Sequence, residues 1–386
     1  MRSKISYNLL FIVCAVLSLQ LSCAHASRLQ KKDAGVAWGK IESYFTPPAD
    51  YINNYGNFRS PLKFYNGDTV ATREDWLLRR KEIKDTWMGL MGMWPPVLTD
   101  QKFEIIETVE KDTYLQHKVR FYWTPNEQTE GYLLIPRNKG KKPAVITVFY
   151  EPETAVGMGN KPNRDFALQL TKRGFVTLSL GTTRTSLEKN YSIYYPGREY
   201  ASIQPLSVLA YAAANALEAL SKVKEVDADR IGIVGHSYGG KWSMFASCLY
   251  DKFACAAWID PGIVFDETKA GGVNYWEPWY LGYYPPPWTN TWRKTGMIED
   301  AKGLYPYLMN NNYDLHELHA LMAPRPFLVS GGSSDPVERW IPLNHSIAVN
   351  RLLGYKNRVA MTNRPKHEPN PESNEIVYSF FECFLK

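Results

Sequence analysis

One serine lies in a pattern typical of a catalytic nucleophile. The segment Gly235-His236-Ser237-Tyr238-Gly239 follows the apolar run 231–234 and precedes a stretch typical of a helix. Small residues at such a junction permit a sharp, strained turn that raises the serine oxygen above the edge of a sheet. A serine hydroxyl is a poor nucleophile unless a base removes its proton. The pattern therefore predicts that Ser237 is a nucleophile with partners elsewhere, the alternative being a glycine-rich turn in which the serine caps a helix.

The base and its acid are expected at the ends of later strands. His367 lies just past the last predicted strand, residues 359–362, and is the best-placed histidine. Asp335 follows the predicted strand 326–330 and is the preferred acid, while Asp260, after the strand 254–259, remains the alternative. In such an arrangement the histidine takes the serine proton and the carboxylate orients the histidine. Both acids are therefore carried forward, and each is expected to line the site.

Backbone N–H groups are the expected donors to a developing oxyanion. One is the N–H of Tyr238, directly after the nucleophile, and the other comes from the loop after the strand 144–149. In that loop Tyr150 and Glu151 have N–H groups, and Pro152 has none. This set of groups predicts acyl transfer at an ester, with no metal and no organic cofactor.

The elements that must position these residues alternate along the chain. Apolar runs at 144–149, 175–180, 231–234, 254–259, 326–330 and 359–362 suit strands buried on both faces of a parallel sheet. Helices are predicted near 165–172, 204–223 and 343–353, after residue 239 and at the end of the chain. Before them, the runs 103–109, 117–123 and 131–136 predict an antiparallel meander, preceded by a helix capped by Thr72. The prediction is an α/β fold with a mostly parallel, doubly wound sheet.

Composition excludes several classes of protein. The 386 residues are 45% hydrophobic and 22% charged, which is typical of a folded globular chain. A net charge of +6 with no basic run does not indicate nucleic-acid binding, although it is compatible with an acidic polysaccharide. The apolar stretch 9–19 is too short to span a bilayer, which needs about 20 residues. No transmembrane segment is predicted.

That short stretch instead predicts export. Basic residues precede it and Ala24-His25-Ala26 follows it, so residues 1–26 are predicted to be a signal peptide. The mature protein is expected in the periplasm, at the cell surface or outside the cell, with lipidation of Cys23 as an alternative anchor. Cys248, Cys255 and Cys383 are expected as free thiols. Residues 27–101 are predicted to form an arm and helix packed on a catalytic domain, 102–386, that carries an insertion at 263–312.

Three passages make the chain resemble the α/β-hydrolase superfamily, and within it the glucuronoyl esterases. They are the segment from Thr72 to Ile83, the segment from Ala323 to Asp335, and the serine turn itself. The resemblance implies that Lys241, four residues after the serine, contacts sugar hydroxyls. The chain differs from that family in having His236 and Tyr238 beside the serine, where the family has cysteine and arginine.

Because that arginine is missing, the main functional expectation is pectin methylesterase activity. Some secreted bacterial α/β-hydrolases that resemble this chain have that activity. The substrate would be a uronic-acid ester of plant cell-wall polysaccharide, and the alternatives are a glucuronoyl esterase and an acetyl esterase acting on xylan or pectin. Less favoured are a prolyl-oligopeptidase-like peptidase and a non-catalytic carbohydrate-binding protein. Aromatic and cationic side chains suit sugar rings and uronates. The expected substrate-binding residues are Lys241, Arg184, Arg339, Trp276, Trp279, Trp288 and Trp340.

Overall fold

A single mixed sheet organises the fold. The computed structural model describes residues 35–187, 193–266, 275, 280–282 and 303–386. In these residues nine strands form one sheet in the order β1-β2-β3-β5-β4-β6-β7-β8-β9. The strands are β1 (Glu104–Glu110), β2 (Tyr114–Thr124), β3 (Glu127–Pro136), β4 (Lys142–Phe149), β5 (Val176–Gly181), β6 (Val226–His236), β7 (Cys255–Ile259), β8 (Phe327–Gly331) and β9 (Val359–Asn363).

Strand direction divides the sheet into the two parts that the sequence predicts. The strands β1, β2 and β3 form an antiparallel meander, and β3 pairs antiparallel with β5. From β5 to β9 all neighbours are parallel. The residues of β4 are buried along its whole length, as expected of a strand covered on both faces. The α/β prediction with a leading meander is confirmed.

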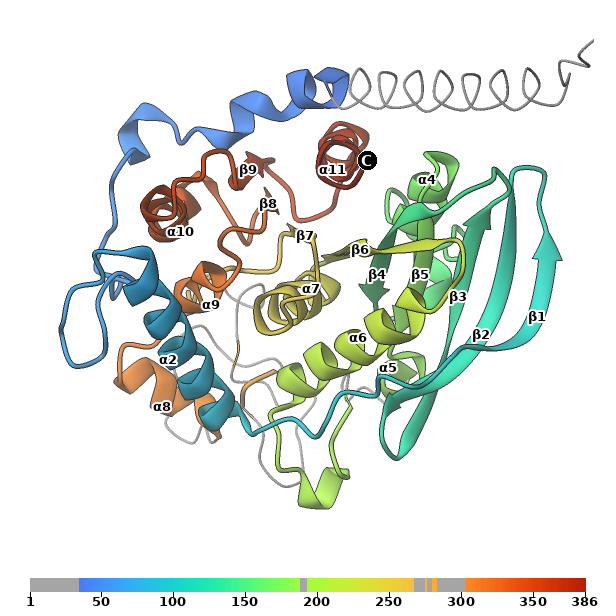
Figure 1. Ribbon diagram of the computed structural model, residues 1–386, viewed down its shortest axis with the longest axis horizontal. Helices are drawn as coiled ribbons and strands as arrows, with labels where there is room; N and C mark the ends of the chain where they lie inside the picture. The colour runs from blue at the N-terminus through green and yellow to red at the C-terminus, as the bar shows by residue number, and fades with distance from the viewer. Residues whose placement is uncertain (1–34, 188–192, 267–274, 276–279, 283–302) are drawn as a thin grey trace, which may run out of the picture.

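Helices cover both faces of this sheet (Figure 1). Alternate residues of β4 show the division, because Ile146 packs in the larger core and Val145 in the smaller one. The larger core includes residues of α2, α6, α7, α9 and α10, and the smaller core includes residues of α4 and α11. The helices are α2 (Arg73–Met91), α3 (Pro152–Ala155), α4 (Phe166–Lys172), α5 (Thr183–Leu187), α6 (Pro205–Ser221), α7 (Tyr238–Leu249), α8 (Leu304–Asn310), α9 (His316–Ala320), α10 (Trp340–Leu352) and α11 (Pro371–Leu385).

The predicted boundaries differ from the observed ones in instructive places. Helix α2 begins where predicted, because the Thr72 hydroxyl and the Asp75 carboxylate each accept the other's backbone N–H. Strand β6 is longer than the predicted run 231–234, because residues 227–230, which precede that run, include three charged residues and are part-buried or exposed. The short helices α3 and α5 were not predicted, since four or five residues carry no readable hydrophobic period.

Two further sequence expectations concern the membrane and the cysteines. Within the described ranges, no helix is both long enough and apolar enough to cross a bilayer. The thiols of Cys248 and Cys255 are free and buried, and that of Cys383 is free and half-buried, as predicted. The proposed signal peptide and Cys23 lie outside the described residues.

Candidate active site

The nucleophile turn joins β6 to α7 through a strained backbone. Ser237 has φ 57° and ψ −114°, a conformation that side chains other than glycine rarely adopt. Its two glycine neighbours permit this turn. A Cβ atom on Gly235 would lie 2.1 Å from the carbonyl oxygen of Gly239, and one on Gly239 would lie 2.0 Å from that of Val148. The turn is therefore packed against β4 with no room for side chains, and the serine is fixed at the end of the sheet.

A histidine and an aspartate complete a hydrogen-bonded line with this serine. Nε2 of His367 lies 2.8 Å from Oγ of Ser237, and Nδ1 of His367 lies 2.6 Å from Oδ2 of Asp260. His367 follows β9 and is part-exposed, whereas Asp260 follows β7 and is fully buried. With the carboxylate accepting from Nδ1–H, the unprotonated Nε2 faces the serine hydroxyl. This is the geometry that a general base requires.

The structure reverses the preference between the two candidate acids. Asp260, the alternative, contacts His367, and its carboxylate also accepts three backbone N–H groups from the loop after β8. Asp335, the preferred acid, does not contact the histidine. Its carboxylate accepts the N–H groups of Gly262 and Ile263 at 2.8 and 2.7 Å. Because these residues follow Asp260 in the chain, Asp335 holds the backbone of the acid rather than the base.

Burial and charge distinguish the second carboxylate. Asp335 is fully buried, and this desolvation, followed by repulsion from Asp260, raises the pKa of its carboxyl to about 6. Its own backbone N–H donates to Asp260 at 2.8 Å, so the two acids are neighbours in one network. Arg339 lies beside it, with Nε 3.6 Å from Oδ1, and partly offsets the repulsion. The network places both predicted acids at the site, as expected, but with different contacts.

Two residues that the sequence did not single out hold the histidine loop. Arg364 is buried, and its guanidinium donates to the carbonyl of His367 at 2.7 Å and to those of Ser330 and Gly331 at the end of β8. His236 lies 3.0 Å from the same carbonyl through Nε2. Since Arg164 donates to Nδ1 of His236, the proton of that ring is on Nε2, and burial keeps the pKa of His236 well below its usual value.

The predicted oxyanion donors lie on two adjoining elements. Tyr238 is the first residue of α7, where backbone N–H groups have no acceptor within the helix. Tyr150 and Glu151 follow β4, and Glu151 caps α3 and pairs with Lys161 through its side chain at 2.8 Å. The rings of Tyr150 and Tyr238 stack with centroids 4.7 Å apart. The structure thus brings the two loops together, and their role toward an oxyanion remains a prediction.

The predicted sugar-contacting residues are mostly enclosed. Lys241 is buried, its ammonium donates to the carbonyl of Pro261, and desolvation lowers its pKa to about 8. Arg339 pairs with Asp266 at 2.5 Å and Trp340 is buried, so neither presents an open surface. Arg184 is exposed on α5, in the wall of a separate pocket. The remaining candidates, Trp276, Trp279 and Trp288, lie outside the described residues.

Comparisons with known proteins agree with this architecture. Residues 51–201 match a model described as the Abhydrolase family, and residues 212–361 match the prolyl oligopeptidase family. A glucuronoyl esterase from Solibacter usitatus has a TM-score of 0.63 at 17% identity, over 85% of this chain and 98% of the other. A second, from Teredinibacter turnerae, has a TM-score of 0.60 at 17% identity, over 92% and 99%. The chain therefore has the α/β-hydrolase fold.

One similar protein supports the resemblance to glucuronoyl esterases. The 4-O-methyl-glucuronoyl methylesterase of Podospora anserina is 23% identical over 297 residues, which is 74% of this chain and 56% of that protein. This chain thus spans little more than half the length of the relative. Among α/β-hydrolases the chain resembles glucuronoyl esterases, as its sequence motifs predicted. These relatives favour the glucuronoyl esterase alternative over pectin methylesterase activity, which the sequence analysis had preferred.

Proposed function

We propose that this chain is a serine esterase that hydrolyses an ester of glucuronic acid in plant cell-wall polysaccharide. The observation that carries the proposal is the continuous line from Ser237 through His367 to Asp260, with both contacts within hydrogen-bond distance. The names of the similar proteins support the uronate ester as the bond. They also displace pectin methylesterase activity as the preferred reaction.

In the proposed reaction His367 takes the proton of Ser237 while Oγ attacks the ester carbonyl. The carbonyl oxygen becomes an oxyanion, which the N–H groups of Tyr238 and of the loop after β4 stabilise. The tetrahedral intermediate collapses, and the alcohol leaves with the proton from His367. A water molecule then attacks the acyl-serine, His367 takes its proton, and the uronic acid is released as Ser237 regains its hydrogen. The chain's own side chains supply every proton transfer in this scheme.

Side chains around the line explain how the base stays in place. The carbonyl of His367 accepts from Arg364 at 2.7 Å and from His236 at 3.0 Å, so its backbone is held from two sides. The Tyr238 side chain is buried and hydrogen-bonded with Thr182. Backbone N–H groups are the oxyanion donors in the proposed mechanism, because this chain has Tyr238 where the glucuronoyl esterases that it resembles have an arginine.

The test compares three substrates. The full chain should release benzyl alcohol from the benzyl ester of glucuronic acid, and Ser237→Ala should release none above background. Methyl-esterified pectin and acetylated xylan serve as parallel substrates for the two competing esterase activities. Methanol from pectin without cleavage of the glucuronate ester would restore the pectin methylesterase alternative, and acetate alone would indicate an acetyl esterase.

Export and domain organisation belong to the same proposal. Residues 1–26 would direct the chain across a membrane, and residues 27–101 would pack on the catalytic domain 102–386. N-terminal sequencing of the protein recovered from its native host tests the first statement. Cleavage after Ala26 is expected, whereas a lipid-modified Cys23 at the N-terminus would identify a lipoprotein.

A further inference from the structure

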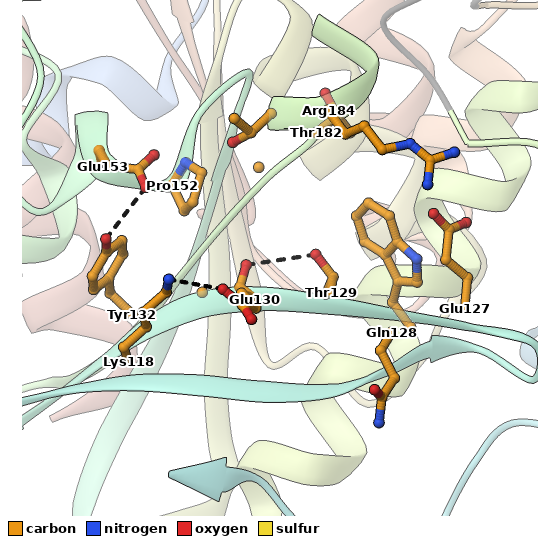
Figure 2. Close-up of a pocket in the computed structure, with 14 residues that line it drawn as sticks. Lys118, Glu127, Gln128, Thr129, Glu130, Tyr132, Pro152, Glu153, Thr182 and Arg184 are labelled. Carbon is orange, nitrogen blue, oxygen red and sulfur yellow. Dashed lines mark hydrogen bonds and ion pairs between the residues drawn. The ribbon is translucent and has the colours of Figure 1, made fainter. Parts of the chain in front are cut away.

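A polar cavity lies beside the candidate active site, at the same end of the sheet. It has a volume of about 360 Å³ and is walled by residues of β2, β3, α3 and α5 together with the end of β5 (Figure 2). Two glycines bring its walls together. A Cβ on Gly131 would lie 2.5 Å from the carbonyl oxygen of Ser179, and one on Gly181 would lie 2.5 Å from the nitrogen of Pro152. The cavity is large enough for a sugar ring, and its floor is backbone.

The lining combines aromatic rings with hydrogen-bonding groups. Trp123 contributes a buried indole, and its N–H has no hydrogen-bond partner among the described residues. The Tyr132 hydroxyl donates to Oε1 of Glu153 at 3.2 Å, and burial raises the pKa of Tyr132 to about 12. Gln128 is exposed, and Figure 2 shows its side chain on the other side of β3 from Glu153 and Thr182. Rings that carry polar groups beside a carboxylate acceptor are a surface on which sugars bind.

The lining carries three carboxylates, on Glu127, Glu130 and Glu153, and two cations, on Lys118 and Arg184, so its charge favours a neutral ligand over an anionic one. Lys118 pairs with Glu130 at 2.8 Å, so this cation is already occupied by a carboxylate of the wall. Glu153 offers its remaining carboxylate oxygen to hydroxyl donors, and within the described residues its carboxylate has one side-chain partner, Tyr132. A uronate would be repelled by Glu153, whereas the hydroxyl groups of an uncharged sugar would donate to it.

The cavity adjoins the candidate oxyanion loop. Pro152 and Glu153 line the cavity and directly follow Tyr150 and Glu151, and two peptide units place the Cα atoms of residues 150 and 152 no more than about 7.6 Å apart. Thr182, which follows Gly181 on the side of the cavity that packs against Pro152, hydrogen-bonds the side chain of Tyr238. The lining of the cavity therefore contacts the residue that follows Ser237.

We propose that this cavity, lined by Trp123, Gln128, Tyr132, Glu153 and Thr182, is a subsite for a neutral sugar unit of the polysaccharide that carries the ester. The inference rests on the proposed function for its substrate. The sugar ring packs against the aromatic wall, and its hydroxyl groups donate to Glu153. The cavity then holds the glycan so that the uronate ester lies over Ser237.

The test compares two esters that differ only in the attached sugars. One is the benzyl ester of glucuronic acid, and the other is the benzyl ester of glucuronic acid linked to xylotriose. The wild-type chain should have the higher kcat/KM on the larger ester. Because a hydrogen bond to a charged acceptor is lost, Glu153→Ala should raise KM for that ester about tenfold with little change in kcat. Glu153→Ala should therefore lower the ratio of kcat/KM on the larger ester to kcat/KM on the smaller one.

Controls separate this inference from the proposed function. Glu372→Ala removes an exposed glutamate on α11 and should leave the ratio as in the wild type. If the wild type cleaves both esters and Glu153→Ala does not change the ratio, the subsite is refuted and the esterase proposal stands. If the wild type cleaves neither ester, calorimetric titration of xylotriose into the wild type and into Glu153→Ala decides. Binding that the substitution weakens supports the subsite, and equal or absent binding refutes it.

Discussion

Asp260→Asn should nearly abolish catalysis, because it reverses the hydrogen bond that orients the base. In the wild type Oδ1 of Asp260 accepts the N–H groups of Gly332 and Asp335 at 2.6 and 2.8 Å, and Oδ2 accepts from His367. An asparagine would keep its oxygen toward the two backbone donors and turn its NH₂ group toward Nδ1 of His367. That nitrogen would then accept, leaving the proton on Nε2, where it donates to Ser237 and cannot remove the serine proton.

The expected loss is about 10⁴-fold in kcat, since the wrong tautomer has an effect of that size in serine enzymes with this arrangement. It corresponds to about 5 kcal/mol of transition-state stabilisation. The assay is release of benzyl alcohol from a benzyl glucuronate ester, with circular dichroism to verify folding. Asp335→Asn is the matched control and should change kcat by no more than about tenfold, because its amide oxygen still accepts one of the two N–H groups of the loop after Asp260 and the residue does not contact His367. A large loss for Asp335→Asn with little loss for Asp260→Asn would show that the acid is Asp335.

Three further changes test the surroundings of the site. Arg364→Ala should lower kcat about 10- to 100-fold, because the loop of His367 loses its tie to β8, and Arg364→Lys should recover part of the loss; an unchanged kcat would contradict this positioning role. Asp335 binds its proton more tightly in the folded chain than in the unfolded chain, so protonation of this carboxyl stabilises the fold. Its contribution to the unfolding free energy, up to about 3 kcal/mol, should be greatest below about pH 4 and be lost as the pH rises through about 6. Urea titrations of wild type and Asp335→Asn should show this difference, and parallel stability curves would refute it. Gly239→Ala should cost about 3 kcal/mol of unfolding free energy, because its Cβ would overlap the carbonyl of Val148, and a midpoint equal to that of the wild type would show that the turn can relax.

Local patterns were enough to predict that Ser237 and His367, the candidate nucleophile and base, lie together. Ser237 lies between a buried strand and a helix, and His367 directly follows the last strand, so sequence order alone indicated their places. The choice of acid depended on more. Asp260 and Asp335 follow the neighbouring parallel strands β7 and β8, and both are fully buried at the same edge. Which carboxylate faces the histidine is decided by backbone N–H groups of loops that have no sequence signature.

The supporting residues were harder to predict for the same reason. Arg364 lies in a loop, and nothing in the neighbouring sequence indicates that its guanidinium reaches four carbonyl groups. A signal did exist for His236, which adjoins the nucleophile, but its effect depends on Arg164 from a distant loop. Lys241 is predicted to contact sugar hydroxyls, and its burial had no signal in the sequence, because it follows from the burial of every residue of α7.

The two strained residues of the site have an evolutionary consequence. Ser237 and Asp260 have φ values of 57° and 48°. The N–H of Ser237 donates to the carbonyl of the residue before Asp260, so the two strained residues lie side by side at one edge of the sheet. Such residues each cost about 1–3 kcal/mol relative to an unstrained backbone, and glycine would remove much of that cost. Selection for stability alone would therefore replace them. Among descendants of this chain, glycine at both positions would mark lineages in which catalysis has been abandoned and the scaffold kept.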